Sequence, residues 1–206
     1  MAIVNVYIDG FNLYYGAVRD SPYRWLDLSA LCARMLPNDA IQTIHYYTAI
    51  VSGRPHDPQQ PLRQQIYLRA LRTIPNLSIN FGKFTTHSRR MVLTGTDPPQ
   101  KVWVDRTDEK GSDVNLAAHL LADAFQKRFE VAVLITNDSD LLEPVRIVSR
   151  ELGYPVGILN PHQYHSCSLK PHATFMKRIR QSDLAACQFP SPMADNKGQF
   201  HKPSGW

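Results

Sequence analysis

The sequence predicts an α/β domain, a Rossmann-like three-layer sandwich in which a mainly parallel sheet lies between two layers of helices. Short apolar runs alternate with helical patterns along the 206 residues, and this alternation implies right-handed crossovers between parallel strands. The runs are apolar at consecutive positions, which is typical of strands buried on both faces. With 43% hydrophobic and 20% charged residues, the chain has the composition and length of one globular domain.

Six apolar runs are the expected strands. They are residues 3–8, 43–51, 77–84, 101–104, 131–136 and 156–159. The third run is expected to continue into a hairpin with residues 91–93. Residues 52–60 and 85–100 fall outside the alternating pattern, and we expect both stretches to be surface excursions.

Five segments between these strands are the expected helices. They are residues 12–18, 28–36, 61–73, 113–128 and 141–152. The fourth has apolar residues spaced i, i+3, i+4, i+7 and i+11, and this spacing predicts its buried face. That face consists of Val114, Ala117, Ala118, Leu121 and Phe125.

The chain ends, the cysteines and the length of the apolar runs predict the limits of the domain and its cellular location. We expect the domain to cover residues 1–188, and residues 189–206, which have no periodicity, to form a flexible C-terminal tail. The three cysteines are widely spaced, which excludes a recognisable disulfide framework and favours a reducing, cytoplasmic location. The N-terminal segment enters the first strand directly and the longest apolar run is residues 131–135, so we expect neither a signal peptide nor a membrane span.

Acidic residues cluster at one predicted edge of the sheet. They are Asp9 after the first strand, Asp113 at the start of the fourth helix, and Asp138 and Asp140 after the fifth strand. Ligands of open parallel sheets bind beyond the carboxyl ends of the strands, so we expect these carboxylates to converge. Like charges in contact raise one another's pKa, and a cation between them would relieve the repulsion. A donor set made only of oxygen suits Mg²⁺ or Mn²⁺, and such an ion can activate a water for attack on a phosphodiester.

Each acid also has a simpler structural interpretation. Asp9 before Gly10 suits a turn. Asp138 and Asp140 suit a helix cap, and Asp113 suits the first turn of a helix, where the dipole favours an acid. A joint site is favoured because three separate segments would otherwise have to place acids at the same edge by accident.

Three motifs resemble the signatures of the NYN domain family, a branch of the PIN-like nucleases. They are DGFNL at residues 9–13, EKGSDV at residues 109–114 and TNDSD at residues 136–140. The resemblance covers roughly residues 1–160 and is strongest to the LabA-like bacterial branch. It implies a Rossmann-like parallel sheet and metal-dependent RNA cleavage.

The resemblance also implies roles for single residues. Asp9, Asp113, Asp138 and Asp140 correspond to the acidic cluster of the family, and Asn12 corresponds to the conserved amide beside the first acid. Asp9 and Asp138 would be direct ligands, and the other two acids would complete the sphere directly or through waters. Asn12 could hold a metal-bound water or a phosphate oxygen. Two positions depart from the family pattern: Asn137, where many members have Gly, and Leu141, where many have an aromatic residue.

The formal net charge is +5, and the basic residues are unevenly spread. Residues 58–96 contain no acid but six Lys or Arg, and residues 170–180 are a second acid-free basic run. Basic stretches beside an acidic metal centre suit a phosphodiester polymer, although they also suit an ordinary solvated surface. The residues expected to contact nucleic acid are Arg89, Arg90, Arg106, Lys110 and Ser139, and the candidate stacking platforms are Tyr14, Tyr15 and Trp103.

A different metal site is a weaker alternative. His162, His165 and Cys167, with His172 beyond them, could hold zinc, but their spacing is not that of a standard zinc finger. The sequence therefore gives this group no definite role.

The function that follows is a Mg²⁺- or Mn²⁺-dependent ribonuclease, an endonuclease acting on single-stranded or structured RNA. One alternative is a non-catalytic RNA-binding or regulatory module that retains the fold, the metal or both. Another keeps the chemistry and changes the substrate to DNA or small phosphoesters. The expected partner is RNA and not a membrane, and a homodimer is left open.

Overall fold

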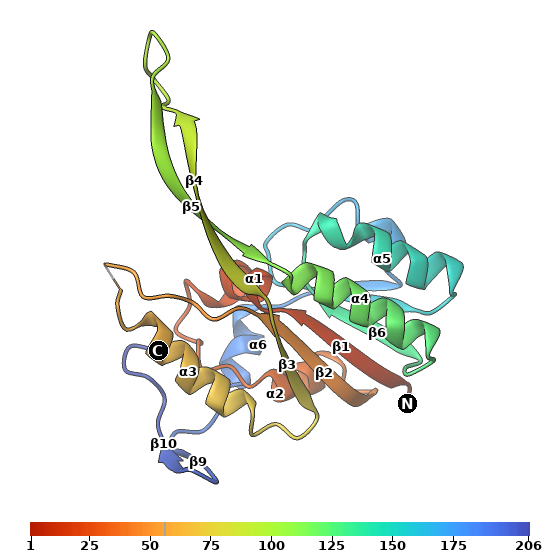
Figure 1. Ribbon diagram of the computed structural model, residues 1–206. Coiled ribbons are helices and arrows are strands. Elements are labelled where there is room, and N and C mark those ends of the chain that lie inside the picture. The colour runs from red at the N-terminus through yellow and green to blue at the C-terminus, as the bar shows by residue number, and fades with distance from the viewer. Residues whose placement is uncertain (56) are drawn as a thin grey trace.

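The computed structural model describes residues 1–55 and 57–206. Its centre is a six-stranded sheet in which every neighbouring pair is parallel (Figure 1). In spatial order the strands are β3 (Leu77–Phe81), β2 (Ala40–Thr48), β1 (Ile3–Asp9), β6 (Val131–Ile135), β7 (Val156–Asn160) and β8 (Phe175–Arg178). The predicted α/β, Rossmann-like fold class is confirmed.

Strand order reverses next to β1. From β1 the chain adds β2 and then β3 on one side, whereas β6, β7 and β8 extend the sheet on the other side. The connections after β1 and β6 therefore diverge at the carboxyl ends of these two strands. This is the place where open α/β sheets bind ligands.

Helices cover both faces of the sheet, so that one hydrophobic core lies on each face. The helical segments are α1 (Gly10–Leu13), a π-helical turn (Tyr14–Val18), α2 (Leu28–Met35), α3 (Gln60–Leu71), α4 (Ser112–Phe125), a 3-10 turn (Ser139–Leu141), α5 (Leu142–Arg146), a π-helical turn (Ile147–Glu151), a 3-10 turn (Lys170–His172) and α6 (Gln181–Ala186). On one face, α2, α3 and α6 pack Leu31, Leu68 and Leu184 into the larger core. On the other, α4 and α5 pack Leu116 and Val145 into the second core.

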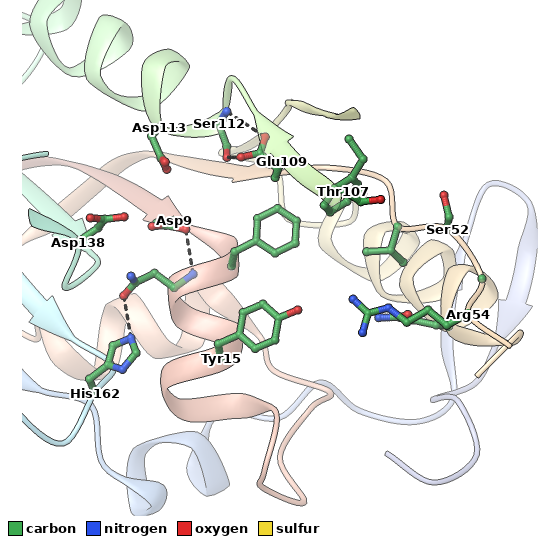
Figure 2. Close-up of a pocket in the computed structure, with 16 residues that line it drawn as sticks. Asp9, Tyr15, Ser52, Arg54, Thr107, Glu109, Ser112, Asp113, Asp138 and His162 are labelled. Atoms are coloured by element: carbon green, nitrogen blue, oxygen red, sulfur yellow. Dashed lines mark hydrogen bonds between the residues drawn. The ribbon is translucent and has the colours of Figure 1, made fainter. Parts of the chain in front are cut away.

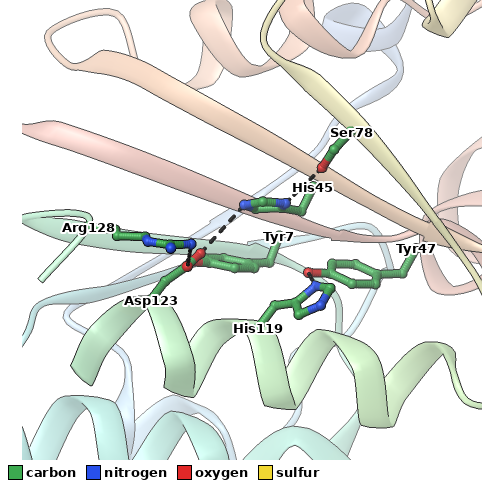
Figure 3. A network of polar contacts seen from close by, with 7 residues as sticks. All are labelled: Tyr7, His45, Tyr47, Ser78, His119, Asp123 and Arg128. Carbon is green, nitrogen blue, oxygen red and sulfur yellow. Dashed lines mark hydrogen bonds and ion pairs between the residues drawn. The ribbon is translucent and has the colours of Figure 1, made fainter. Parts of the chain in front are cut away.

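A buried polar network connects α4 to β1 and β2, on the face of the sheet that α4 and α5 cover (Figure 3). The Tyr7 hydroxyl donates a hydrogen bond to Asp123 Oδ2 at 2.7 Å. Arg128 and His45 contact the same carboxylate at 3.1 and 3.5 Å. Asp123 is 4% exposed, and its charge is met by partners from β1, β2 and the segment that follows α4.

The buried face of α4 differs from the predicted one. Val114 and Phe125, which the spacing predicts to be buried, are 70% and 66% exposed. The helix buries Leu116, Leu120 and Ala124 in their place. The segment carries alanine and leucine on more than one side, so more than one apolar stripe satisfies the helical period.

The predicted strand at residues 101–104 is not part of the central sheet. It belongs to β5 (Lys101–Lys110), which pairs antiparallel with β4 (Lys83–Val92). Figure 1 shows these two strands extending away from the body as a long hairpin, which we call the arm. The first half of the predicted excursion at residues 85–100 therefore lies in regular strand. The sixth place in the sheet is taken by β8, whose four residues include two cations and lack a continuous apolar run.

The last residues are packed, which differs from the predicted flexible tail at residues 189–206. A hairpin of β9 (Met193–Asp195) and β10 (Gly198–Phe200) follows the domain. The rings of Phe200 and Trp206 both lie 6.4 Å from the ring of Trp25. The reason is that a few isolated aromatic residues anchor the segment, and these leave no periodic signal in the sequence.

Among the described residues, no helix is both long and apolar enough to cross a membrane. Residue 56, within the predicted excursion at residues 52–60, lies outside the described residues.

Candidate active site

Three carboxylates meet at the predicted edge of the sheet (Figure 2). Asp9 is the last residue of β1, Asp113 is the second residue of α4, and Asp138 lies three residues after β6. One oxygen of each lies within 4.8 Å of the others. The convergence follows from the fold, because β1 and β6 are parallel neighbours and α4 begins beside their carboxyl ends.

The Asp9 side chain is held in place by its neighbours. It is 5% exposed, and Oδ1 accepts a hydrogen bond from the Asn12 backbone N–H at 2.9 Å. The Thr136 hydroxyl donates to Oδ2 at 3.3 Å and accepts from the Asp138 backbone N–H at 3.1 Å. Gly10 lets the start of α1 pack closely against β2, because a Cβ there would lie 2.5 Å from the Tyr47 carbonyl oxygen and 2.7 Å from the Tyr46 ring.

The carboxylates repel one another. Burial, together with the negative charges of Asp113 and Asp138, raises the pKa of Asp9 to about 6, against the opposing hydrogen bond from Asn12. Burial, followed by the charge of Asp138, also raises the pKa of Asp113. An all-oxygen donor set in which Asp9 is buried and Asp113 and Asp138 are half-buried fits a hard divalent cation, because the cation relieves the repulsion.

The fourth predicted acid lies outside this group. Asp140 is exposed, and its backbone N–H donates to Asp138 Oδ1 at 3.0 Å. Its charge still contributes to the raised pKa of Asp113. The structure thus places Asp138 as the cap of a 3-10 turn with Asp140 beside it, and a ligand role for Asp140 stays a prediction.

Asn12 faces the site with its amide group oriented by two contacts. Its Oδ1 accepts a hydrogen bond from the Asn137 backbone N–H at 2.9 Å and lies 3.1 Å from His162 Nε2. Because Oδ1 is occupied by donors, the Nδ2 group is the part that remains for a ligand. Asn12 therefore suits an anionic oxygen better than a cation.

His162 and Arg54 are site residues that the sequence did not place beside the acids; it named His162 as a candidate zinc ligand. Both line an open cleft of about 560 Å³ together with the three acids, and Figure 2 shows Arg54 across the cleft from them. The His162 ring lies against the helix backbone at Gly16, where a Cβ would approach it to 2.8 Å. Neither residue had a usable signal, since each lies on a loop far from the motifs in sequence.

The weaker zinc alternative gains no support. His165 Nδ1 lies 3.0 Å from Asn160 Nδ2, and His162 is turned towards Asn12. Among the described residues, the converging group of acids, histidines and cysteines is Asp9, Asp113 and Asp138. The histidines are therefore parts of a hydrogen-bonded loop beside the acids.

The residues predicted to contact nucleic acid lie around the cleft and not in its lining. Arg89, Arg90, Arg106 and Lys110 are exposed on the arm, and Ser139 is exposed beside Asp138. Arg106 is paired with Asp108 at 2.8 Å. The base of the arm does line the cleft, through Phe84, Thr107 and Glu109. The arm and the acids are thus continuous parts of one surface.

Comparison with known proteins assigns the family. The family model of the NYN domain matches residues 3–177. The chain belongs to the NYN domain family. NYN domains are a branch of the PIN-like nuclease superfamily, and the three clustered acids of this NYN protein lie in the motifs that resemble the family signatures.

Two similar proteins place this NYN protein further. It is 27% identical to 6-hydroxy-3-succinoylpyridine 3-monooxygenase HspA of Pseudomonas putida, over 98% of this chain and 74% of that protein. Its structure is similar to that of a protein of unknown function from Vibrio parahaemolyticus, with a TM-score of 0.59 and 16% identity over 91% of this chain and 96% of the other. The second similarity shows a shared fold.

Proposed function

We propose that this NYN protein is a metal-dependent ribonuclease that cuts RNA internally at the three-carboxylate site. The observation that carries the proposal is the convergence of Asp9, Asp113 and Asp138 within 4.8 Å at one end of an open cleft of about 560 Å³. Membership of a PIN-like nuclease family supports the reaction class. The all-oxygen donor set supports Mg²⁺ or Mn²⁺ as the cofactor.

The side chains have distinct tasks in this proposal. Asp9, Asp113 and Asp138 hold the cation, with Asp140 beside them. When bound, the cation would activate a water for attack on phosphorus and stabilise the charge on the departing oxygen. Asn12 presents its amide N–H groups to a non-bridging phosphate oxygen. Arg54, on the opposite wall of the cleft, offsets the charge of the adjoining backbone.

The arm extends the proposed binding surface beyond the cleft. Phe84 at its base lines the cleft, and Arg90, six residues further along β4, pairs in register with Trp103. At about 3.3 Å per residue this pair lies roughly 20 Å from the cleft. Trp103 is 71% exposed and offers a face on which a base can stack. We propose that RNA runs from the cleft along the arm, past Lys110 and Arg106 towards Arg89 and Arg90, with Ser139 contacting the strand near the acids.

Sequencing of cleavage ends tests the proposal. Total RNA is incubated with Mn²⁺ and either the wild type or Asp138→Asn, and with the wild type in EDTA. We expect defined new ends with the wild type alone. The matched control is Asp20→Asn, since Asp20 is exposed and its ion pair is with Arg19. Cleavage that survives in Asp138→Asn would overturn the assignment, and RNA binding without cleavage by the wild type would favour a non-catalytic module. The same reaction with DNA of matching sequence separates the DNA alternative.

A second candidate function is oxygenation of a pyridine ring, the activity named for the Pseudomonas putida relative. It is favoured by the extent of that similarity, 98% of this chain, and by an aromatic-lined hollow beside the cleft. The test is incubation of the purified protein with 6-hydroxy-3-succinoylpyridine, O₂ and an electron donor. A hydroxylated pyridine, together with no RNA cleavage, would replace the nuclease proposal with this one.

A further inference from the structure

A second hollow lies beside the carboxylate cleft and has aromatic walls. Its volume is about 150 Å³. It lies where the first helical segment after β1, helix α3 and the C-terminal residue meet. The aromatic side chains around it are Phe11, Tyr14, Tyr15, Tyr46, Tyr67 and Trp206.

The hollow and the cleft adjoin one another. Phe11, Tyr15, Val51 and Gln60 line both of them. A ligand that places an anionic group near the acids can therefore place a neighbouring group in the hollow. A nucleotide has this composition, with a phosphate joined through a sugar to a flat ring.

The walls of the hollow are fixed by internal hydrogen bonds. Gln64 uses both ends of its amide, accepting from the Val51 backbone N–H at 2.9 Å and donating to the Ala49 carbonyl at 2.8 Å. The Tyr67 hydroxyl donates to the Leu26 carbonyl at 2.9 Å. These groups therefore shape the hollow and are not available to a ligand.

Two polar side chains at the boundary are available. The Gln60 amide and the Tyr15 hydroxyl make no side-chain hydrogen bond to another described residue, and both line the cleft as well as the hollow. An amide and a hydroxyl supply donors and acceptors together, which match the mixed polar edge of a base. Aromatic walls with a few polar groups at the mouth are typical of sites for flat heterocyclic ligands.

The size of the hollow limits the ligand. Besides the aromatic residues, the charged residues Arg24, Asp57 and Arg63 line the hollow. A cavity of about 150 Å³ has room for one benzene-sized ring. A pyrimidine has one ring, whereas a purine has two fused rings. The hollow therefore favours a pyrimidine.

We propose that this hollow is a base-binding subsite that takes the pyrimidine of the nucleotide whose phosphate lies at the carboxylates. The inference rests on the proposed function for the position of that phosphate. It goes further in naming the base, so that RNA would be cut at a fixed position relative to a pyrimidine and not at random.

Binding of mononucleotides, which have no phosphodiester bond to be cut, to the full-length wild-type protein tests the subsite without turnover. Calorimetric titrations compare uridine 5′-monophosphate, adenosine 5′-monophosphate and inorganic phosphate in the presence of Mg²⁺. Since stacking of one base contributes about 1–3 kcal/mol, we expect the uridine nucleotide to bind at least about fivefold more tightly than the other two. Tyr15→Ala and Gln60→Ala in the same background should remove this preference, whereas Tyr164→Ala, an exposed tyrosine outside the hollow, should leave it unchanged. Equal affinities for the two nucleotides, or a preference that survives Tyr15→Ala, would overturn the subsite.

Mapped cleavage ends separate a failure of the subsite from a failure of the proposed function. The subsite predicts a pyrimidine at one fixed position next to the cut, lost in Tyr15→Ala. Metal-dependent cleavage with no base preference would overturn the subsite and leave the nuclease intact. Preferential binding of the uridine nucleotide without cleavage by the wild type would overturn the nuclease and leave the base-binding hollow intact.

Discussion

Two buried aspartates on the same face of the sheet have opposite surroundings. Asp123 is 4% exposed and Asp9 is 5% exposed, so burial alone does not distinguish them. The Asp123 carboxylate accepts a hydrogen bond from the Tyr7 hydroxyl at 2.7 Å and forms an ion pair with the Arg128 guanidinium at 3.1 Å. Asp9 has a backbone N–H and a hydroxyl for partners and two further acids beside it.

This difference in hydrogen-bond and ion-pair partners indicates that Asp123 has a structural role, whereas Asp9 lies in a group of acids that needs a ligand. The charge of Asp123 is compensated within the fold, so its network can fasten α4 to the sheet without any addition. Among the described residues, Asp9, Asp113 and Asp138 form no ion pair with a cationic side chain, and a bound cation would compensate their charge. Buried charges are stable where they are paired, and the unpaired group therefore identifies the functional site.

The largest expected effect on stability comes from removing Asp123, whose charge is paired within the fold. Asp123→Ala leaves the buried Tyr7 hydroxyl without its acceptor, and we expect the free energy of unfolding to fall by about 3 kcal/mol. Urea denaturation followed by circular dichroism measures it. Asp20→Ala removes an exposed acid and should change stability by less than about 0.5 kcal/mol. A loss of under about 1 kcal/mol in Asp123→Ala would mean that the network does not fasten the helix.

Removing one acid from the group Asp9, Asp113 and Asp138 is expected to raise the stability of the metal-free protein and not to lower it. In EDTA, Asp138→Asn removes one of three repelling charges, so the free energy of unfolding at pH 7.5 should rise by about 1 kcal/mol. Asp140→Asn, outside the converging group, should raise it less. A destabilised Asp138→Asn in EDTA would show that the acids do not repel one another as described.

The pH dependence of the metal-free protein follows from the same repulsion. The pKa of Asp9 is raised from 3.8 to about 6 in the folded protein, so the folded state binds the proton more tightly than the unfolded state. The stability that Asp9 contributes is complete below pH 4 and is lost as the pH rises through about 6. Unfolding in EDTA between pH 4 and 7.5 checks this, and saturating Mg²⁺ should reduce the loss.

A smaller effect is expected from His162, which acts through Asn12. His162→Ala removes the ring that lies 3.1 Å from Asn12 Oδ1, and we expect kcat for RNA cleavage to fall about tenfold with little change in KM. His162→Gln, which keeps a donor, should restore part of the rate. His165→Ala is the matched control, because His165 contacts Asn160 and not Asn12. A rise in KM with unchanged kcat would mean that His162 binds RNA and does not position the amide.

The sequence predicted the features that depend on parallel strands. Asp9 and Asp138 follow neighbouring strands, and the carboxyl ends of such strands meet at one edge, so their proximity could be anticipated. Asp140 could not be placed in the same way, because one step along the 3-10 turn carries its side chain out to solvent. The local geometry of a turn is not visible in the spacing of acids.

Features that depend on packing or on distant loops were missed. The apolar residues of the arm, such as Val102 and Val104, resemble a core strand in sequence although they lie on an isolated hairpin. The contributions of His162 and Arg54 arise when separate loops meet at the cleft. The C-terminal segment is held by Phe200 and Trp206, single aromatic anchors with no period.

The most direct test of the contrast between the two aspartates is the binding of Mn²⁺ itself. Titration followed by electron paramagnetic resonance counts bound ion in the wild type, Asp138→Asn and Asp123→Asn. We expect stoichiometric binding by the wild type and by any folded fraction of Asp123→Asn, and at least about a tenfold loss of affinity in Asp138→Asn. Unchanged Mn²⁺ affinity in Asp138→Asn would contradict the assignment of the three carboxylates as the metal site.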